Sequence, residues 1–355
     1  MKIAILGNGV SGLSAAVVLS NNPYIKKIDI ISDSINSPGG EYIKGGLKYI
    51  YDTPDTENFL EQLNLYYEKK KINGALLYED NIHFYPECMY KFSKSKSLGI
   101  QQKYWDKTRG ASAANNNIDY RCMNSPWNND NNNDISLNII GGTYVFIKTI
   151  VDFLNECPIV NYIQTNVDEN SVKNILKEYD HIIYTIPFSI FSESILNKKL
   201  DLKFKKLFIA RFIVDRWVSG NIWWDYLYNI SEEYSFHRIS CMPIGATDHL
   251  LDLEFNNDQS NYENMLIDFI KRYIYKNFSS VNYTPDFVGD ISIKGQISND
   301  LYRSNIRISE IEDEYPNISF IGRYAEFDKK ITFNKVIKKI YMINNKIKGI
   351  VWKII

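Results

Sequence analysis

Three glycines near the amino end of the chain have the spacing Gly7-x-Gly9-x-x-Gly12, with Ser11 just before the last of them. Glycines at these positions allow a tight turn, let a pyrophosphate approach the backbone closely, and let a helix pack tightly on the preceding strand. The amides at the start of that helix and the positive end of its dipole would then face the phosphates. We therefore predict that Gly7, Gly9, Ser11 and Gly12 bind the phosphates of a dinucleotide.

The residues around this turn have the pattern of a βαβ unit. Residues 2–6 have the pattern of a buried strand, residues 11–20 that of a helix, and residues 27–32 that of a second strand. In a dinucleotide-binding unit, an acidic residue after the second strand holds the ribose hydroxyls. Asp33 is our choice for this role, with Ser32 as the alternative if the strand is shifted by one residue.

Two further positions are candidates for contact with the same half of the cofactor. Gly40 belongs to a Gly-Gly-Glu segment, where FAD enzymes of this type often bring a second glycine pair to the pyrophosphate, although no arginine precedes it here. Val167 lies where such folds often pass a strand by the adenine. A valine of the hydrophobic core would fit the same pattern, so both interpretations of Val167 stay open.

A second glycine turn near the carboxyl end distinguishes between cofactors. Residues 318–321 are an apolar run that leads into Gly322 and Arg323, and a helical pattern begins near Thr332. Gly322 would let the backbone pass the pyrophosphate or ribitol, and the helix amides would stabilise negative charge on a reduced flavin ring. Arg323 either joins this site or is a surface cation. Because a fold that binds NAD alone needs no such closing segment, the predicted cofactor is FAD.

The rest of the chain predicts a second, strand-rich region that interrupts the nucleotide-binding lobe. Apolar spacing predicts helices over residues 58–71, 144–154, 262–278 and 333–347, and strands over residues 180–186, 207–214, 222–228 and 236–242. The predicted fold class is α/β, with a Rossmann-type FAD-binding domain and a β-rich, partly helical substrate lobe. The predicted segments are an FAD-binding lobe over residues 1–50, 136–190 and 301–355, a substrate or cap segment over 51–135, and the β-rich substrate lobe over 191–300.

With these motifs in place, the chain resembles UDP-galactopyranose mutase and the amine-oxidase-like FAD-binding superfamily. In the mutase family a strand arginine holds the substrate diphosphate, and the segment FHRIS around Arg238 is similar to that strand. A second arginine precedes a glycine-rich helix start in the family, as Arg121 precedes Gly141-Gly142 here. Trp105 is similar in position to a tryptophan near the sugar site. The resemblance therefore implies substrate-contacting or catalytic roles for Arg121, Arg238 and Trp105.

Two features depart from the mutase pattern. The family has a histidine-bearing loop after the first glycine pair, whereas residues 45–52 contain Lys48 and Tyr51 and no histidine. The segment over residues 40–105 is also far shorter than the usual helical substrate domain. The resemblance therefore implies the fold more strongly than the reaction.

Composition bounds the other classes of function. The formal net charge is −1 over 355 residues, so overall charge does not favour nucleic acid or an anionic membrane, although a local basic cleft for either a phosphate or nucleic acid is not excluded. The four cysteines have no CxxC spacing and the four histidines form no cluster, so no metal site is expected, and such scattered thiols are typical of a cytoplasmic protein. No apolar stretch is long enough to span a bilayer. Whether the protein forms a homodimer stays open.

These observations favour an enzyme whose chemistry belongs to a flavin. Our first hypothesis is an FAD-dependent oxidoreductase that acts on a small polar substrate, with or without a phosphate. The alternative is a non-redox mutase of a nucleotide-linked sugar, in which Arg121 and Arg238 would hold the diphosphate. A third hypothesis is an FAD-binding module without catalytic activity.

Overall fold

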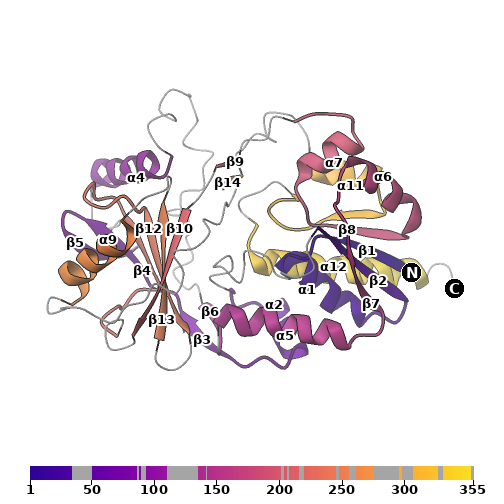
Figure 1. Ribbon diagram of the computed structural model, residues 1–355, viewed down its shortest axis with the longest axis horizontal. Helices are drawn as coiled ribbons and strands as arrows, with labels where there is room; N and C mark the ends of the chain where they lie inside the picture. The colour runs from indigo at the N-terminus through magenta and orange to yellow at the C-terminus, as the bar shows by residue number, and fades with distance from the viewer. Residues whose placement is uncertain are drawn as a thin grey trace. The chain divides into compact units, whose positions relative to one another are not determined.

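The chain forms two compact units, each with its own main sheet (Figure 1). The computed structural model describes residues 1–33, 50–85, 88, 93–109, 135–140, 142–200, 204–205, 208–215, 220–244, 248–255, 261–275, 296–297, 307–326 and 331–352. The first unit consists of Met1–Lys69, Ser136–Lys205 and Gly295–Ile355, and the second of Lys70–Ile135 and Lys206–Lys294. Within the described ranges, no helix is both long enough and apolar enough to cross a membrane.

A parallel five-stranded sheet forms the centre of the first unit, with the strand order β15-β8-β1-β2-β7. Its strands are β1 (Lys2–Leu6), β2 (Lys27–Ser32), β7 (Val160–Gln164), β8 (His181–Tyr184) and β15 (Ile318–Phe320). The sheet grows from β1 through β2 to β7, and then continues on the other side of β1 with β8 and β15. In open α/β sheets, ligands bind at the carboxyl ends of the strands where the order reverses in this way.

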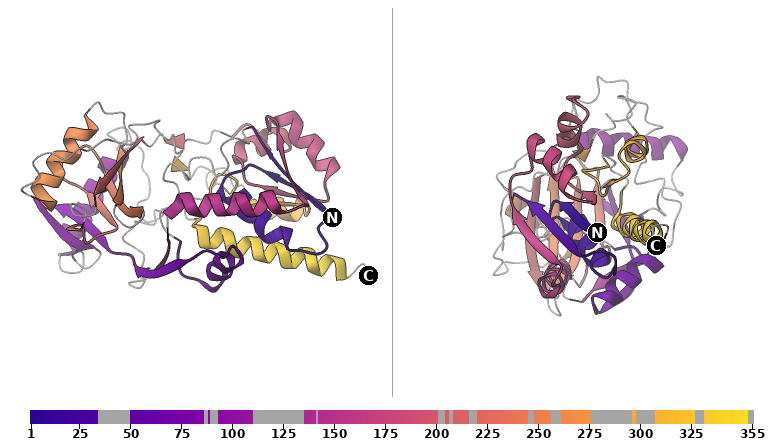
Figure 2. Two further views of the ribbon diagram at one scale, coloured as in Figure 1. Left: turned by 60° about the horizontal axis from the view of Figure 1, so that its bottom comes forward. Right: turned by 90° about the vertical axis from the view of Figure 1, so that its right-hand side faces the viewer.

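Helices cover both faces of this sheet (Figure 1). Ile3 and Ile5 of β1 contribute to one hydrophobic core, and Ala4 and Leu6 contribute to the other, because successive side chains of a strand point to opposite faces. The first core includes residues of α1 (Val10–Ser20), α2 (Pro54–Gln62), α5 (Gly142–Glu156) and α12 (Phe333–Trp352), and the second includes residues of α6 (Glu169–Glu178), α7 (Phe188–Ser194) and α11 (Ile308–Glu314). The long α12 runs beside α1 and α2 (Figure 2).

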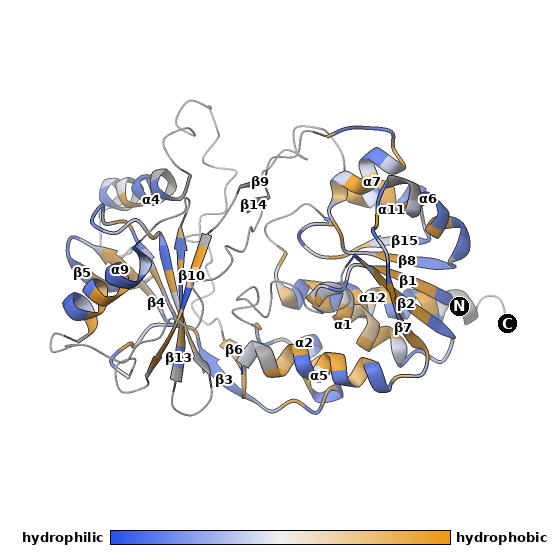
Figure 3. Ribbon diagram, viewed as in Figure 1, coloured by the Kyte–Doolittle hydropathy of each residue, from blue (hydrophilic) through white to orange (hydrophobic). Residues whose placement is uncertain are grey.

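Helix α5 illustrates why these segments form amphipathic helices (Figure 3). Phe146, Ile150 and Leu154 are spaced four residues apart and are buried against the sheet. Lys148 and Asp152 lie on the exposed side and form an ion pair across one helical turn. The spacing of apolar residues thus determines which side of α5 packs on the sheet.

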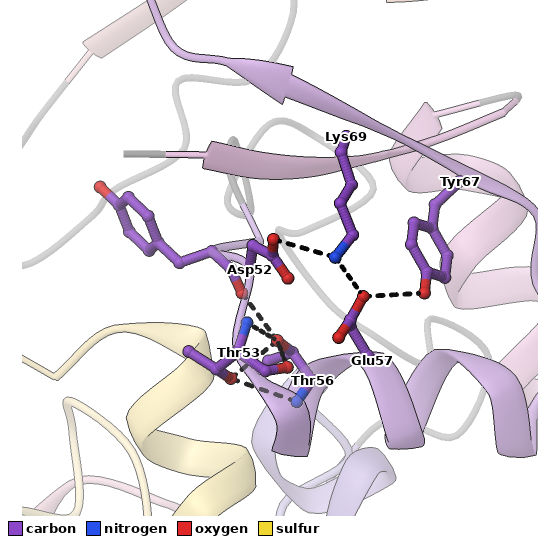
Figure 4. Close-up of polar contacts among 7 residues, drawn as sticks. Asp52, Thr53, Thr56, Glu57, Tyr67 and Lys69 are labelled. Carbon is purple, nitrogen blue, oxygen red and sulfur yellow. Dashed lines mark hydrogen bonds and ion pairs between the residues drawn. The ribbon is translucent and has the colours of Figure 1, made fainter. Parts of the chain in front are cut away.

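A capping box fixes the start of α2 (Figure 4). The Thr53 Oγ1 accepts a hydrogen bond from the Thr56 N–H at 3.3 Å, and the Thr56 Oγ1 accepts one from the Thr53 N–H at 3.0 Å. Pro54 occupies the first helical position, where its missing N–H costs no helical hydrogen bond. These local interactions explain why a helix begins here.

The helix predicted over residues 58–71 is wrong in its second half. Helix α2 ends at Gln62, Asn64 adopts a φ of 52°, and the chain continues as a strand. From that strand, Lys69 reaches back to Glu57 of α2 with 2.5 Å between Nζ and Oε1 (Figure 4). This contact between strand and helix is tertiary, so the local apolar spacing did not predict it.

The two small sheets pair β3 (Tyr67–Lys71) with β6 (Ile135–Ile139) and β9 (Phe204–Lys205) with β14 (Gln296–Ile297).

A six-stranded sheet with the order β10-β13-β12-β11-β4-β5 forms the second unit. Its strands are β4 (Gly74–Tyr78), β5 (Asn81–Tyr85), β10 (Phe208–Asp215), β11 (Tyr226–Asn229), β12 (Arg238–Ile244) and β13 (Asp248–Phe255). All neighbouring strands are antiparallel except β11 and β4, which are parallel. The predicted α/β fold class, with a Rossmann-type domain and further sheets, is confirmed. The five predicted segment boundaries stay a prediction.

The two faces of this second sheet have different chemistry. One face carries aliphatic and phenylalanine side chains that pack against α9 (Tyr262–Phe269) and the π-helical turn η5 (Ile270–Ile274). The opposite face packs a tyrosine-rich cluster against α4 (Lys94–Arg109), where the rings of Tyr104 and Tyr228 meet edge to face with centroids 5.0 Å apart. The charged residues Arg211, Arg238, Asp252 and Glu254 lie on this second face.

Candidate functional site

The turn between β1 and α1 requires glycine at two positions. Gly7 has a φ of +103°, and its N–H donates to the Ile31 carbonyl of β2 at 2.8 Å. A Cβ on Gly12 would lie 2.1 Å from the Gly7 carbonyl oxygen, which is a backbone atom that cannot move without opening the turn. Gly7 and Gly12 are therefore explained by the packing of the protein itself.

Gly9 differs from its neighbours because protein packing does not require a glycine there. Its φ of −68° suits any residue, and among the described residues no atom lies within 4 Å of an added Cβ. Gly9 is the N-cap of α1, no side chain caps the helix, and the first turn contains no acidic residue. Within the described part of the chain, the start of α1 thus presents backbone amides and the positive end of the helix dipole to space that no described atom fills, which fits the approach of a phosphate group.

The loop after β8 closes one side of this turn. Thr185 donates from both its N–H and its hydroxyl to the Leu6 carbonyl, at 3.1 Å and 2.6 Å. A Cβ on Gly7 would lie 2.6 Å from the Thr185 Oγ1 and 3.0 Å from the Ile186 side chain. Thr185 was not predicted from the sequence. The only signal was that the apolar run over residues 180–186 ends here, at a strand whose position in the sheet was unknown.

The second predicted glycine turn lies directly against the first. Gly322 follows β15 with a φ of +94°, and a Cβ there would lie 2.7 Å from the Ser11 Oγ and 3.3 Å from the Ser11 Cβ. Two motifs at opposite ends of the chain are therefore in contact within one unit. This juxtaposition places the turn after β15 beside the uncapped start of α1.

Arg323 and Thr332 connect this turn to the start of α12. The Arg323 Nε donates to the Ile331 carbonyl at 2.7 Å. The Thr332 carbonyl accepts the Val336 N–H at 3.1 Å, so Thr332 occupies the N-cap position of α12, where its hydroxyl contacts the Asn334 side chain. The helix begins where the sequence predicted it, and the Arg323 guanidinium anchors the chain that leads into it.

A partly buried ionic network holds the Gly322 turn. The Glu326 Oε1 accepts the Gly322 N–H at 3.0 Å, and the Glu326 N–H donates back to the Gly322 carbonyl at 2.9 Å. Lys339 of α12 bridges Glu326 and Glu312 at 3.2 Å and 3.0 Å, and the Glu312 Oε1 accepts the Phe320 N–H at 2.9 Å. This network was not predicted from the sequence, because a lysine on an amphipathic helix has the pattern of a solvent-exposed cation.

The contribution of Glu326 to the free energy of unfolding should fall as the pH rises. Burial raises the pKa of Glu326 above its ordinary value of 4.5, and Lys339 and the Gly322 N–H offset this effect only in part. A carboxyl whose pKa is higher in the folded state stabilises fully below its unfolded pKa and loses that contribution as pH rises through the folded pKa. Glu326→Gln should remove this part of the pH dependence above pH ~4.5.

Chemical denaturation of both proteins at a series of pH values measures this effect. The exposed Glu61→Gln provides a control substitution on α2. The difference in unfolding free energy between wild type and Glu326→Gln should shift steadily against wild type as pH rises. A shift in favour of wild type would show that the ion pair with Lys339, and not burial, dominates the environment of Glu326.

The residues predicted to hold the adenosine half lie at the carboxyl ends of β2 and β7. Asp33 directly follows β2 and is exposed, its side chain accepts a hydrogen bond from Ser32 at 3.2 Å, and its carbonyl accepts one from Gln164 at 3.2 Å. Val167 is buried in the hydrophobic core that includes Ile31. Gly40 lies outside the described residues. Roles for these three residues in cofactor binding stay predictions.

The residues that the resemblance implied for substrate contact belong to the second unit or lie outside the described residues. Arg238 begins β12, and its Nη2 lies 2.7 Å from the Glu254 Oε1 of β13. Trp105 lies in α4, whose neighbouring Tyr104 packs on the same sheet face as Arg238. Arg121 lies outside the described residues. Among the described residues, no group of three or more histidine, cysteine or acidic side chains is arranged to hold a metal ion.

Comparisons with known proteins show similarity in structure and none in sequence. No family model matches the chain, and no curated protein is similar to it in sequence. A crystal structure of reduced UDP-galactopyranose mutase is similar over 98% of this chain and 94% of its own, with a TM-score of 0.63 and 14% identity. A putrescine oxidase variant with redesigned cofactor binding is similar over 98% of this chain and 99% of its own, with a TM-score of 0.58 and 11% identity.

An oxygenase extends the same comparison to a different reaction. A variant of 2-methyl-3-hydroxypyridine-5-carboxylic acid oxygenase is similar over 98% of this chain and 82% of its own, with a TM-score of 0.51 and 9% identity. These proteins differ in chemistry and share the architecture, so the similarity concerns the fold. The resemblance predicted from the glycine motifs is confirmed at that level, because the chain shares its fold with a UDP-galactopyranose mutase and a putrescine oxidase.

Proposed function

We propose that the protein is an FAD-dependent oxidoreductase that acts on a small polar substrate. The observation that carries this proposal is the contact between Ser11 and the Gly322 turn, which unites two predicted cofactor motifs at the carboxyl ends of β1 and β15. A turn that bound only a mononucleotide would not need the second motif. The shared architecture with flavoenzymes supports the same conclusion.

Different residues of the first unit would bind different parts of the cofactor. The uncapped amides at Gly9 and Ser11 would bind the pyrophosphate, with Gly7 and Gly12 shaping the turn. Asp33 would accept hydrogen bonds from the ribose hydroxyls. Bound FAD would supply the acceptor for a hydride from the substrate.

The carboxyl-terminal turn would hold the other end of the cofactor. Gly322 would let the backbone pass close to the ribitol or pyrophosphate, and the N-cap residue Thr332 would place the start of α12 toward the flavin. Glu326 would act here as a positioning residue, because it bonds to the N–H and the carbonyl of Gly322, and Lys339 would hold the Glu326 carboxylate in place.

An ion pair in the second unit favours an oxidoreductase over the mutase alternative. A mutase arginine must present donors to a diphosphate, and the Nη2 of Arg238 already lies 2.7 Å from the Glu254 Oε1. On the same sheet face, Arg211 is bound through two nitrogens to Asp252, at 2.8 Å and 3.2 Å. A diphosphate would have to compete with both carboxylates, whereas a small polar substrate can bind beside neutralised pairs.

The test begins with the visible spectrum of the purified protein after incubation with FAD. We expect a bound flavin spectrum that bleaches on anaerobic addition of an oxidisable amine from a substrate panel, with peroxide released when oxygen is admitted. Interconversion of UDP-galactopyranose by the dithionite-reduced protein alone would support the mutase instead. A flavin that neither bleaches nor supports interconversion would support a non-catalytic module, and a protein that never binds FAD would overturn the proposal.

A further inference from the structure

A cavity of about 370 Å³ lies in the second unit, between α4 and the segment over residues 230–235. The residues that line it are Lys103, Lys107, Ile230, Glu232, Tyr234 and Ser235. Lys103 and Lys107 are four residues apart on α4 and therefore lie on the same side of the helix. The volume suits a small organic molecule. The proposed FAD-binding residues of the first unit do not contribute to it.

Lys107 is the unusual residue of this cavity. Its side chain is half-buried, and its Nζ donates to the backbone carbonyls of Ser231 and Tyr234. Burial lowers the pKa of Lys107 to about 7, against an opposing effect of Glu232. The neutral amine, with two N–H bonds, and the ammonium, with three, can both donate to these carbonyls, and burial is what favours the neutral, nucleophilic form.

The carbonyls that hold Lys107 belong to a well-braced loop. The buried Asn229 side chain donates to the Tyr234 carbonyl at 3.2 Å and to the Phe236 carbonyl at 2.7 Å, and it accepts the Ser231 N–H at 2.9 Å. The Tyr234 hydroxyl donates to Asp268 of α9 at 2.7 Å. Backbone atoms that are fixed in this way determine where the amine lies, so the position of Nζ is preorganised.

We propose that Lys107 is a nucleophilic amine that condenses, in this cavity, with a small aldehyde carrying an acid group. The Nζ attacks the carbonyl carbon to form a carbinolamine, which loses water to give an imine. One C–N double bond replaces one C–O double bond, and the oxygen leaves with two hydrogens as water, so no oxidant or reductant is needed. Lys103, an exposed cation on the same wall, would bind the acid group.

Reductive labelling of the full-length protein tests this proposal, with 4-carboxybenzaldehyde as the probe and cyanoborohydride to trap the imine. Peptide mass spectrometry then compares Lys107 with Lys103, which lines the same cavity and serves as an internal control. At pH ~7 we expect Lys107 to be labelled at least about tenfold faster, because an ordinary lysine with a pKa of ~10.4 is almost entirely protonated there. The difference in labelling rate between Lys107 and Lys103 should narrow as the pH approaches ~10.

Three matched comparisons make the outcome decisive. Lys107→Arg keeps a cation that can donate to both carbonyls and should abolish the fast label. Benzaldehyde, which lacks the acid group, should label wild-type Lys107 more slowly, and Lys103→Gln should remove that preference while Lys107 still reacts. Equal rates at Lys103 and Lys107 at pH ~7, or protection of Lys107, would overturn the proposal. The wild-type comparison alone decides the question if the arginine variant does not fold.

Discussion

Gly9→Asp is expected to stabilise the flavin-free protein by about 0.5 to 1 kcal/mol and to weaken FAD binding at least about a hundredfold. The stabilisation follows because Gly9 is an N-cap in extended geometry, where an aspartate can accept a first-turn N–H and complement the helix dipole. The loss of binding follows because the same carboxylate would occupy the amides proposed for the pyrophosphate. The two effects have opposite signs, which separates this site from a merely structural turn.

Two measurements on the same preparations check this prediction. Urea denaturation without FAD gives the change in unfolding free energy, and titration of flavin fluorescence gives the change in the FAD dissociation constant. Gly9→Asn is the matched control, because asparagine caps as well as aspartate and has nearly the same shape without its charge. It should stabilise the helix and weaken FAD binding less than Gly9→Asp. Unchanged FAD affinity in Gly9→Asp would remove Gly9 from the phosphate site.

The glycine turns could be predicted from the sequence because their requirements are local. A φ near +100°, as at Gly7 and Gly322, strains any residue with a Cβ, and the backbone contact of 2.1 Å at Gly12 leaves no room for one, so these glycines are typical of the motifs that predicted them. Gly9 belongs to the same motif, but no described atom lies within 4 Å of an added Cβ there, so protein packing does not account for this glycine. The spacing alone could not separate these two reasons, and the structure does.

Contacts between distant segments could not be predicted in the same way. The apolar spacing of residues 58–71 continues past Gln62, yet the chain leaves the helix there, because the strand that follows is tied back to Glu57 by Lys69. Lys107 and Lys339 likewise have the spacing of surface lysines on helices. Their partners are backbone carbonyls in one case and two glutamates in the other, and no local pattern indicates either.

The residues implied by family resemblance form a third group. Arg238 lies on a strand, as the resemblance implied, but the resemblance gave no indication that Glu254 would pair with it. A motif match identifies the residue type and the element, whereas the net charge available to a ligand depends on the neighbouring strand. The role of Arg238 in substrate binding therefore stays a prediction, and Glu254 must be part of any test of it.

Gly322→Ala is expected to reduce the free energy of unfolding by about 2 to 3 kcal/mol. A positive φ of this size costs an alanine about 1 to 2 kcal/mol, and the added Cβ would also lie 2.7 Å from the Ser11 Oγ. Ser11→Ala removes that oxygen and relieves the contact without changing φ. The double variant should therefore be about 1 kcal/mol more stable than the sum of the two single changes predicts.

A double-mutant cycle by chemical denaturation measures this coupling, with far-ultraviolet circular dichroism as the signal. Because the chain has two units, Gly99→Ala on α4 serves as a control for the transition of the second unit. No described atom lies within 4 Å of an added Cβ at Gly99, and the change should stabilise α4 by about 0.5 to 1 kcal/mol without coupling to Ser11. Strict additivity of Gly322→Ala and Ser11→Ala would separate the two glycine turns and remove the main support for a cofactor that spans them. A coupling of the expected sign would establish, in solution, the contact between the two ends of the chain on which the proposed FAD site depends.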